Sequence, residues 1–302
     1  MIFKLIFRKL LFNDFALKLI SLFYVNKWNK KNQNLNSYNS IKVKGWADWN
    51  QKIKHVREEI HPRFILSSEI ARKAFSPVGH KNLPYKFQDI KANRDIYFLV
   101  ASTASEIFSF LDFGKAISWV SQWGAILDLA TSRMNNEGNE PKVIIEFGSG
   151  IGINPIIQHI SNPHAKIKLY DLEEMVELQK TIHNYWNDEG FILEKNKFEY
   201  YHDVNDLYED IESEKDIDFY AFWSFSESPI ELRNLFNKIL IKCKRIVFVS
   251  NQSIFGIDNL EYFQDLKKYL GKTHNYNSFK LPVANESTYL KNHLIHCFNE
   301  KS

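Results

Sequence analysis

The chain has 302 residues, 44% of them hydrophobic, which suits a globular protein of two domains or of one domain with a large extension. It contains two cysteines, Cys243 and Cys297, too few for a disulfide framework, so we expect a reducing, cytoplasmic compartment. The first 60 residues carry 12 Lys and Arg against 4 Asp and Glu, and the remainder carries 27 against 32. An acidic main body argues against nucleic acid as a substrate or partner.

Residues 1–26 combine large apolar side chains with a basic stripe that includes Lys4, Arg8, Lys9 and Lys18. Charges at this density exclude a transmembrane span, and no small-residue cleavage site supports a signal peptide. The pattern predicts an amphipathic helix, with residues 1–25 in peripheral contact with the inner face of the cell membrane. The alternative is a helix that packs on the rest of the chain or on a second subunit of a homo-oligomer.

The next segments differ in periodicity. Residues 27–40 are polar and rich in asparagine, which predicts a linker. Residues 41–135 place apolar side chains at three- and four-residue intervals, which predicts several helices that form a substrate-binding or lid region. The stretch "NNEGNEP" interrupts this pattern, so we expect a domain boundary near Asn135 and a second domain over 136–302.

From Pro141 onward, short apolar runs alternate with longer amphipathic stretches, a pattern typical of a mostly parallel sheet covered by helices. The expected strands are 142–147, 166–171, 197–202, 216–223, 245–251, 276–282 and 289–298. The expected helices are 155–160, 173–190, 204–212, 228–240 and 258–271. Asn154 and Ser228 each precede a proline and are predicted to cap helices. The loops after the first and fourth strands should therefore share the carboxyl edge of the sheet, where ligands bind.

The stretch "VIIEFGSGIG", residues 143–152, places glycine at three alternate positions after Glu146. This spacing differs from the G-x-G-x-x-G fingerprint, in which the start of a helix faces a pyrophosphate. Glu146 would repel a pyrophosphate but would suit an ammonium group. Asp171 ends the next predicted strand, where a carboxylate can accept both hydroxyls of a ribose. The pattern favours an amino-acid-bearing nucleoside, and the alternative is a tight turn without a ligand.

Residues 146–152, "EFGSGIG", closely resemble the first motif of class I S-adenosylmethionine-dependent methyltransferases, and the resemblance covers about residues 140–298. It implies an α/β fold with a Rossmann-like, seven-stranded, mostly parallel sheet whose last strand is antiparallel. The α-helical N-terminal region predicted from periodicity precedes this fold and lies outside the resemblance. The resemblance also implies that residues 136–302 bind S-adenosylmethionine. The implied binding residues are Glu146, Gly148, Ser149, Gly150, Gly152, Asp171, Leu172, Asp203, Val204, Phe222 and Trp223.

Two further stretches resemble O-methyltransferases. "YDLEEMVELQ" is similar to a D-L-P-E segment found in several of them, with Glu173 where proline is usual. "DIDFYAFWSFSESPIELRNLF" resembles the "NYAFSE" stretch of bacterial sugar O-methyltransferases, which residues 223–225 follow only loosely. The resemblance implies a sugar or glycan hydroxyl as acceptor, on a surface polysaccharide or its precursor. The alternatives are a small metabolite, an amine, or a methyltransferase-like scaffold without catalysis.

Methylation of a hydroxyl needs a general base. Glu227 is the first candidate, because it follows the fourth strand and precedes a helix at the expected ligand edge. The alternative is a solvated carboxylate that complements the dipole of that helix. His274, ahead of the sixth strand, is the second candidate. His293 and His296 are predicted to point to opposite faces of a strand, so we predict no metal site there.

Phe222, Trp223 and Phe225 could stack on adenine or on the face of a sugar. Aromatic residues make up 15% of the chain, however, and the alternative for each of the three is a place in the core.

Overall fold

The computed structural model describes residues 94–107, 113–132, 140–188, 195–254, 256–281 and 293–301. The predicted amphipathic helix over 1–26, the linker over 27–40, the first part of the helical region 41–135 and the boundary near Asn135 lie outside these residues. Within the described part of the chain, no helix is both long and apolar enough to cross a bilayer.

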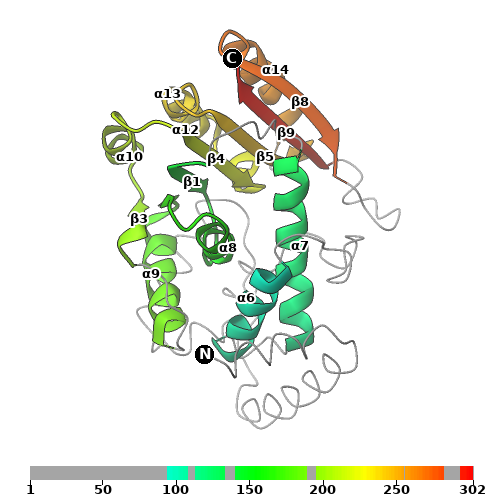
Figure 1. Ribbon diagram of the computed structural model, residues 1–302. Coiled ribbons are helices and arrows are strands. Elements are labelled where there is room, and N and C mark those ends of the chain that lie inside the picture. Colours follow the sequence, from blue (N-terminus) through cyan, green and yellow to red (C-terminus); the bar gives the residue numbers. More distant parts are fainter. Residues whose placement is uncertain are drawn as a thin grey trace.

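A seven-stranded sheet forms the centre of the molecule, with the strand order β3-β2-β1-β4-β5-β9-β8 (Figure 1). All neighbouring strands are parallel except that β9 runs antiparallel to β5 and β8. The strands are β1 (Val143–Phe147), β2 (Lys166–Tyr170), β3 (Phe198–Tyr201), β4 (Ile217–Phe222), β5 (Arg245–Asn251), β8 (His274–Lys280) and β9 (His293–Glu300). This topology confirms the predicted Rossmann-like class, including the antiparallel last strand. A separate two-stranded sheet pairs β6 (Ser253–Ile254) with β7 (Ile257–Asp258).

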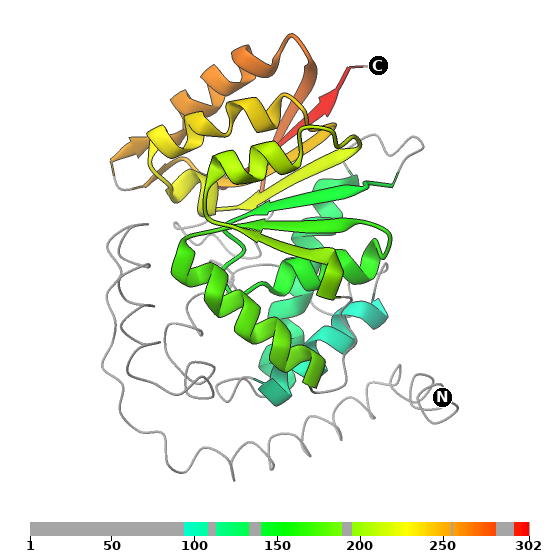
Figure 2. The same cartoon turned by 90° about the vertical axis from the view of Figure 1, so that its left-hand side faces the viewer.

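Helices cover both faces of the sheet, as the view in Figure 2 shows. One face carries α6 (Arg94–Ile107), α7 (Phe113–Ser132), α8 (Ile153–Ser161) and α9 (Glu173–Asp188). The other face carries α10 (Val204–Asp210), α11 (Ser224–Glu227), α12 (Ile230–Leu235), α13 (Asn237–Leu240) and α14 (Asn259–Leu270). A 3₁₀ turn, η3 (Lys195–Lys197), precedes β3.

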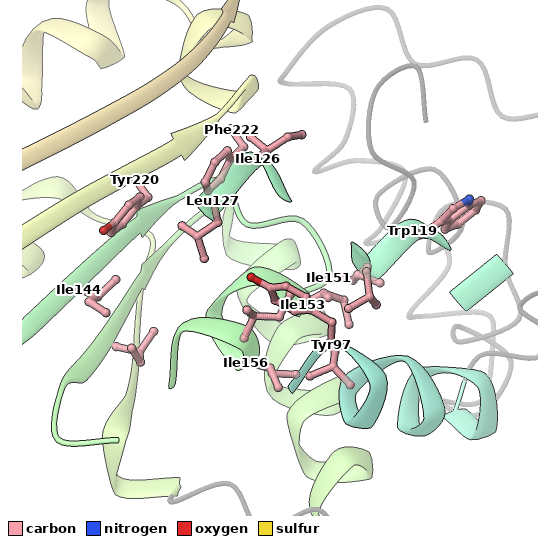
Figure 3. Packing of buried hydrophobic residues seen from close by; sticks show 14 of the residues in the cluster. Tyr97, Trp119, Ile126, Leu127, Ile144, Ile151, Ile153, Ile156, Tyr220 and Phe222 are labelled. Carbon is pink, nitrogen blue, oxygen red and sulfur yellow. The ribbon is translucent and has the colours of Figure 1, made fainter. Parts of the chain in front are cut away.

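Each strand supplies alternate residues to two separate cores, which explains why the strands read as continuous apolar runs. In β4, Tyr220 and Phe222 face α6 to α9, whereas Phe219 and Ala221 face α10 to α14. Figure 3 shows Tyr97 of α6 beside Ile153 at the start of α8. Helices α6 and α7 therefore belong to the same hydrophobic core as one face of the sheet.

Both predicted helix caps are wrong. Helix α8 starts at Ile153 after Gly152, which adopts a left-handed conformation (φ 79°, ψ 25°) and needs no side-chain cap. Asn154 therefore lies inside the first turn, and its side chain donates a hydrogen bond to Glu146. Ser228 closes the short helix α11, where its hydroxyl donates to the Phe225 carbonyl (2.9 Å). Helix α11 has no periodic signal in the sequence, because it is only one turn long.

Candidate active site

The carboxyl ends of five parallel strands form one continuous edge, which we call the rim. Hydrogen bonds join each strand end to the next. From β3 to β5, the donors and acceptors are Asp171 N to Tyr201 O (3.1 Å), Gly148 N to Tyr170 O (2.7 Å), Ser224 Oγ to Phe147 O (2.6 Å) and Trp223 N to Val249 O (2.7 Å). The loops after β1 and β4 therefore meet at the rim, as the strand order requires.

The glycine loop, residues 148–152, needs glycine for conformational reasons. Gly148, Gly150 and Gly152 have φ values of 65°, 58° and 79°, a region that L side chains rarely adopt. A Cβ atom at Gly152 would also lie 2.6 Å from Nε2 of His183. The alternation of glycines thus reflects three left-handed residues in a five-residue turn.

Glu146 is buried beneath this loop, with 2% of its surface exposed. Burial raises the pKa of its carboxyl well above 4.5, hydrogen bonds from Asn154 and Gln158 oppose this shift, and the nearby Asp171 reinforces it. Glu146 Oε2 still has no hydrogen-bond partner among the described residues, and the same is true of Gln158 Oε1 and Ser149 Oγ. A buried acid beside unpaired acceptors suits a ligand group that donates several hydrogen bonds and carries positive charge.

Asp171 is the second buried acid of the rim. Burial raises its pKa to about 7, although the Leu172 N–H, the Gln179 side chain and the Gly150 N–H all stabilise the carboxylate. The Leu172 N–H donates at 2.8 Å and Gln179 Nε2 at 2.9 Å. No lysine or arginine is among the groups that shift the pKa of either acid. The pair would therefore oppose a pyrophosphate at this position.

The other predicted cofactor residues lie along the rim with different degrees of access. Asp203 is exposed at the end of β3, where its carboxylate accepts from the Asn205 N–H (2.6 Å) at the start of α10. Leu172 is half-buried against the core that contains α8 and α9. Val204 is buried in the opposite core, so only its main chain borders the rim.

Trp223 has an unusual backbone at the end of β4, with φ 61° and ψ −40°. This conformation is strained for a residue with a side chain, and strain of this kind concentrates at functional sites. Its indole Nε1 donates to His293 Nδ1 (2.9 Å). Trp123 of α7 makes edge-on contacts with both Phe222 and Trp223, each with ring centroids 5.8 Å apart. These three aromatic rings, from α7 and the end of β4, pack together, and Phe222 and Trp223 are buried in the core that contains α6 to α9.

Glu227 is half-buried on α11, and burial raises the pKa of its carboxyl, whereas a hydrogen bond from Asn251 lowers it. Asn251 is the last residue of β5. Its Oδ1 lies 3.0 Å from the Ser226 hydroxyl, so its amide nitrogen is the group that faces Glu227. The acid is therefore held between the ends of β4 and β5.

Arg233 fixes the backbone of the turn that carries Glu227. Its side chain is fully buried, and its guanidinium donates to three oxygens: Ser226 O (2.6 Å), Ser228 O (2.9 Å) and Asn259 Oδ1 (2.7 Å). It also lies over the Tyr262 ring, 5.0 Å from its centroid. Burial lowers the pKa of this guanidinium to about 10. Because the two carbonyls flank Glu227 in sequence, Arg233 sets the direction of the backbone that carries the acid.

His274 is the second base that the sequence predicts, and the structure excludes it from the rim. It pairs with Glu300 at the start of β8, level with the amino end of β5 and thus at the opposite edge of the sheet. Its Nε2 lies 2.6 Å from the Cys243 carbonyl, and its Nδ1 lies 2.8 Å from the Thr273 hydroxyl. The prediction of the strand is confirmed, but its direction places this residue away from the ligand edge.

His293 and His296 do point to opposite faces of β9, as predicted. His293 contacts Trp223, whereas His296 lies between Ser250 (2.8 Å) and Tyr276 (2.8 Å) in the other core. The described residues contain no cluster of three or more side chains that could hold a metal ion.

Sequence reasoning missed several functional candidates: Asn154, Gln158, Gln179, His183, Asn251 and Arg233. Two signals were present. Gln179 and His183 are four residues apart on the otherwise apolar face of a helix, and Arg233 is a cation in the apolar stretch "IELRNLF". Asn251 has no such signal, because its role depends on the neighbouring strand.

No protein-family model matches the chain, and no curated protein does. Solved structures are similar at low identity. The methyltransferase domain of bacterial CtHen1 is 12% identical, with a TM-score of 0.43 over 59% of this chain and 97% of that chain. Magnesium protoporphyrin IX methyltransferase from Synechocystis PCC 6803, with bound SAM, is 11% identical, with a TM-score of 0.44 over 88% of this chain and 100% of that chain. Precorrin-6y C5,15-methyltransferase from Geobacter metallireducens is 12% identical, with a TM-score of 0.41 over 59% and 88%.

Proposed function

We propose that the protein is an S-adenosylmethionine-dependent methyltransferase that methylates a hydroxyl group of a sugar or glycan. The observation that carries the proposal is the pair of buried acids, Glu146 and Asp171, at a rim loop of three left-handed glycines. Their chemistry fits the two ends of an aminoacyl nucleoside, one cationic and one rich in hydroxyls.

The residues of the rim fit this cofactor from end to end. Glu146 would hold the ammonium group, because its carboxylate is buried with unpaired acceptor capacity. Asp171 would accept hydrogen bonds from the ribose hydroxyls. The glycine loop lies between the two acids and lets the ligand approach the backbone. Leu172, Asp203 and the main chain at Val204 border the neighbouring part of the rim, where the base would lie.

When bound, this cofactor supplies a methyl group on a sulfonium, which leaves as a neutral thioether and needs no acid. The protein must align the acceptor oxygen and help to remove its proton. Glu227 would accept that proton. The proposal is supported by its position on the turn after β4, which is hydrogen-bonded to the end of β1 through Ser224. Its raised pKa makes it a stronger base than an exposed glutamate.

A sugar or glycan acceptor is supported by the resemblance of residues 216–236 to a stretch of bacterial sugar O-methyltransferases, and by the half-buried ring of Trp123 at the end of β4. Aromatic rings can pack against the C–H face of a sugar ring while polar groups bind its hydroxyls. Peripheral membrane contact through residues 1–25, which would bring the enzyme to lipid-linked glycans, also stays a proposal. Deletion of residues 1–25 should then release the protein from membranes, and retention on membranes would contradict the contact.

The test is calorimetric titration of the full chain with S-adenosylmethionine, S-adenosylhomocysteine and 5′-methylthioadenosine. We expect the two aminoacyl nucleosides to bind more tightly than methylthioadenosine, and we expect Glu146→Gln to remove most of that difference. Absence of binding would overturn the proposal. Transfer of labelled methyl groups to a panel of glycans, small hydroxylated metabolites and amines then identifies the acceptor. Methylation of amines or metabolites alone would correct the sugar assignment, and binding without any transfer would favour a scaffold.

A further inference from the structure

Helix α9 directs two buried polar side chains at the glycine loop. Gln179 and His183 are one helical turn apart, so they lie on the same face of α9. They are 0% and 4% exposed. Each approaches the carbonyl of a glycine with a left-handed backbone: Gln179 approaches Gly150 and His183 approaches Gly152. Two side chains one helical turn apart therefore reach two glycines that are two residues apart.

The Gln179 amide must present its nitrogen to the loop. Its Nε2 is 2.7 Å from the Gly150 carbonyl and 2.9 Å from Asp171 Oδ2, and both of these groups can only accept when the acid is ionised. The Gly150 N–H in turn stabilises the Asp171 carboxylate. The N–H and the C=O of Gly150 are thus both fixed by one closed network of Gly150, Asp171 and Gln179.

The His183 ring has one defined tautomer for a similar reason. The Gly152 carbonyl, 3.1 Å from Nε2, can only accept, so Nε2 carries the proton. Nδ1 therefore accepts from the Tyr200 hydroxyl on β3 (2.6 Å). Burial lowers the pKa of His183 to about 4, which keeps the ring neutral near pH 7. Tyr200 and His183 thereby link β3 to the start of α8.

We propose that Gln179 and His183 form a brace that turns the carbonyls of Gly150 and Gly152 toward α9 and so fixes the glycine loop in its ligand-binding conformation before the cofactor arrives. The two side chains are positioning residues and do not react. The significance of the brace for cofactor binding rests on the proposed function, whereas its action on the loop does not.

The brace reduces an entropic cost that the three glycines of the loop impose on ligand binding. Glycine loses more conformational freedom on ordering than any other residue, so a ligand that had to order three glycines would bind weakly. Side chains that order the loop in advance remove that penalty from the binding step. The 2.6 Å approach of His183 Nε2 to a Cβ at Gly152 shows how closely the brace follows the backbone.

The first test measures amide hydrogen exchange in the ligand-free full chain. Gln179→Met removes the donor with little change in shape, and His183→Phe keeps the aromatic ring that packs on Phe198. Tyr200→Phe removes only the hydroxyl that donates to His183 Nδ1 and is the mildest variant. Gln122→Met on α7 is the matched control, because it removes a buried helical amide that donates to Ser118 one turn earlier. Thermal unfolding checks that each variant folds.

We expect exchange across residues 148–152 to become faster in the three brace variants, least in Tyr200→Phe, more in His183→Phe and most in Gln179→Met. Exchange across β4 should stay unchanged, and Gln122→Met should match the wild type everywhere. Unchanged exchange in the loop of Gln179→Met and His183→Phe would overturn the brace. Acceleration spread evenly over the sheet would show a general loss of stability and would also overturn it.

The second test measures affinity for S-adenosylmethionine. Loss of the Gln179 donor should weaken binding at least about tenfold, because it leaves two buried acceptors unpaired. Gln179→Glu should weaken binding further, because it adds a third carboxyl group beside Glu146 and Asp171, within hydrogen-bonding distance of Asp171. Equal affinity of Gln179→Met and the wild type would refute the effect on binding. A wild-type chain that binds no S-adenosylmethionine would overturn the proposed function instead, and the exchange result would still decide whether the brace exists.

Discussion

The glycine loop after β1 and the turn after β4 meet at a hydrogen bond from Ser224 to the Phe147 carbonyl, yet different forces hold each of them. The loop takes its shape from left-handed glycines and from two side chains of the second helix that follows it. The turn takes its shape from side chains, chiefly Arg233, which lies five to seven residues further along the chain than the carbonyls it binds, and Asn251 at the end of β5. A loop shaped by its glycines leaves a motif in the sequence, whereas a turn held only by side-chain contacts does not.

The largest expected effect separates the chemistry of the turn from the binding role of the loop. Glu227→Gln should lower the rate of methyl transfer by about 10²–10⁴-fold, because it removes the general base. The affinity for S-adenosylmethionine, measured by calorimetry, should change little. Glu231→Gln, on the exposed side of α12, is the matched control. Loss of cofactor binding in Glu227→Gln would show that this acid binds the cofactor. It would contradict the separation of roles between the glycine loop and the turn after β4.

Gly152→Ala tests the backbone basis of the loop. The substitution forces an L residue into φ 79° and sets a Cβ 2.6 Å from His183 Nε2, so we expect affinity for S-adenosylmethionine to fall about 100-fold. Gly256→Ala is an informative control, since Gly256 has φ 81° but a Cβ added there would meet no heavy atom within 4 Å. Strain alone should destabilise that variant by about 1 kcal/mol and leave binding intact. Equal effects at the two glycines would mean that the contact with His183 is irrelevant.

Arg233→Lys tests the side-chain basis of the turn. Lysine keeps the charge but loses the planar fork that reaches three oxygens, so the free energy of unfolding should fall by about 2–4 kcal/mol. Urea denaturation measures this change, with exposed Asn234→Ala on the same helix as the control. The rate of methyl transfer should also fall, while cofactor affinity should not. An unchanged denaturation midpoint would show that the turn does not depend on Arg233.

The smallest expected effect is a pH dependence of the affinity for S-adenosylmethionine, which depends on Asp171 and does not involve the turn after β4. Burial raises the pKa of Asp171 from 3.8 to about 7, so the carboxyl is largely protonated below about pH 7 and must lose its proton to accept ribose hydroxyls. Affinity for S-adenosylmethionine should therefore rise between about pH 5.5 and about pH 7.5, by up to about tenfold per unit below the pKa. Asp171→Asn should bind weakly and with a flatter pH profile. A flat profile in the wild type would contradict this role for Asp171.

The same shift has the opposite consequence for the ligand-free fold. Because the folded protein holds this proton more tightly than the unfolded chain does, the stability contributed by Asp171 is complete below pH 3.8 and declines as the pH rises to about 7. Thermal unfolding of the wild type and Asp171→Asn across this range measures the contribution. The cofactor-binding half is thus less stable under the conditions in which it binds best.

The fold could be predicted because its strands are buried on both faces and separated by amphipathic helices. The glycine loop and the acids at Glu146 and Asp171 could be predicted because a short stretch of chain contains each of them. The cap prediction fails at Asn154 because the left-handed Gly152 starts helix α8 at Ile153, which leaves Asn154 inside the first turn. The prediction for His274 fails because the residue at the start of a strand parallel to β5 lies at the edge of the sheet opposite to the ligand edge. Asn251 depends on the pairing of two neighbouring strands, which no local pattern encodes.

Strand β9 is antiparallel to its neighbours. Its first residue, His293, therefore lies at the edge of the sheet where the parallel strands have their last residues. Its register opposite Asn251 extends that edge by one position, and the added side chain stands on hydrogen-bonded strand backbone instead of on a connecting loop. The indole of Trp223 therefore donates its hydrogen bond to a side chain that a strand holds in place. The antiparallel direction of β9 thereby provides a hydrogen-bond partner for Trp223, the one aromatic residue with a left-handed backbone in the described part of the molecule.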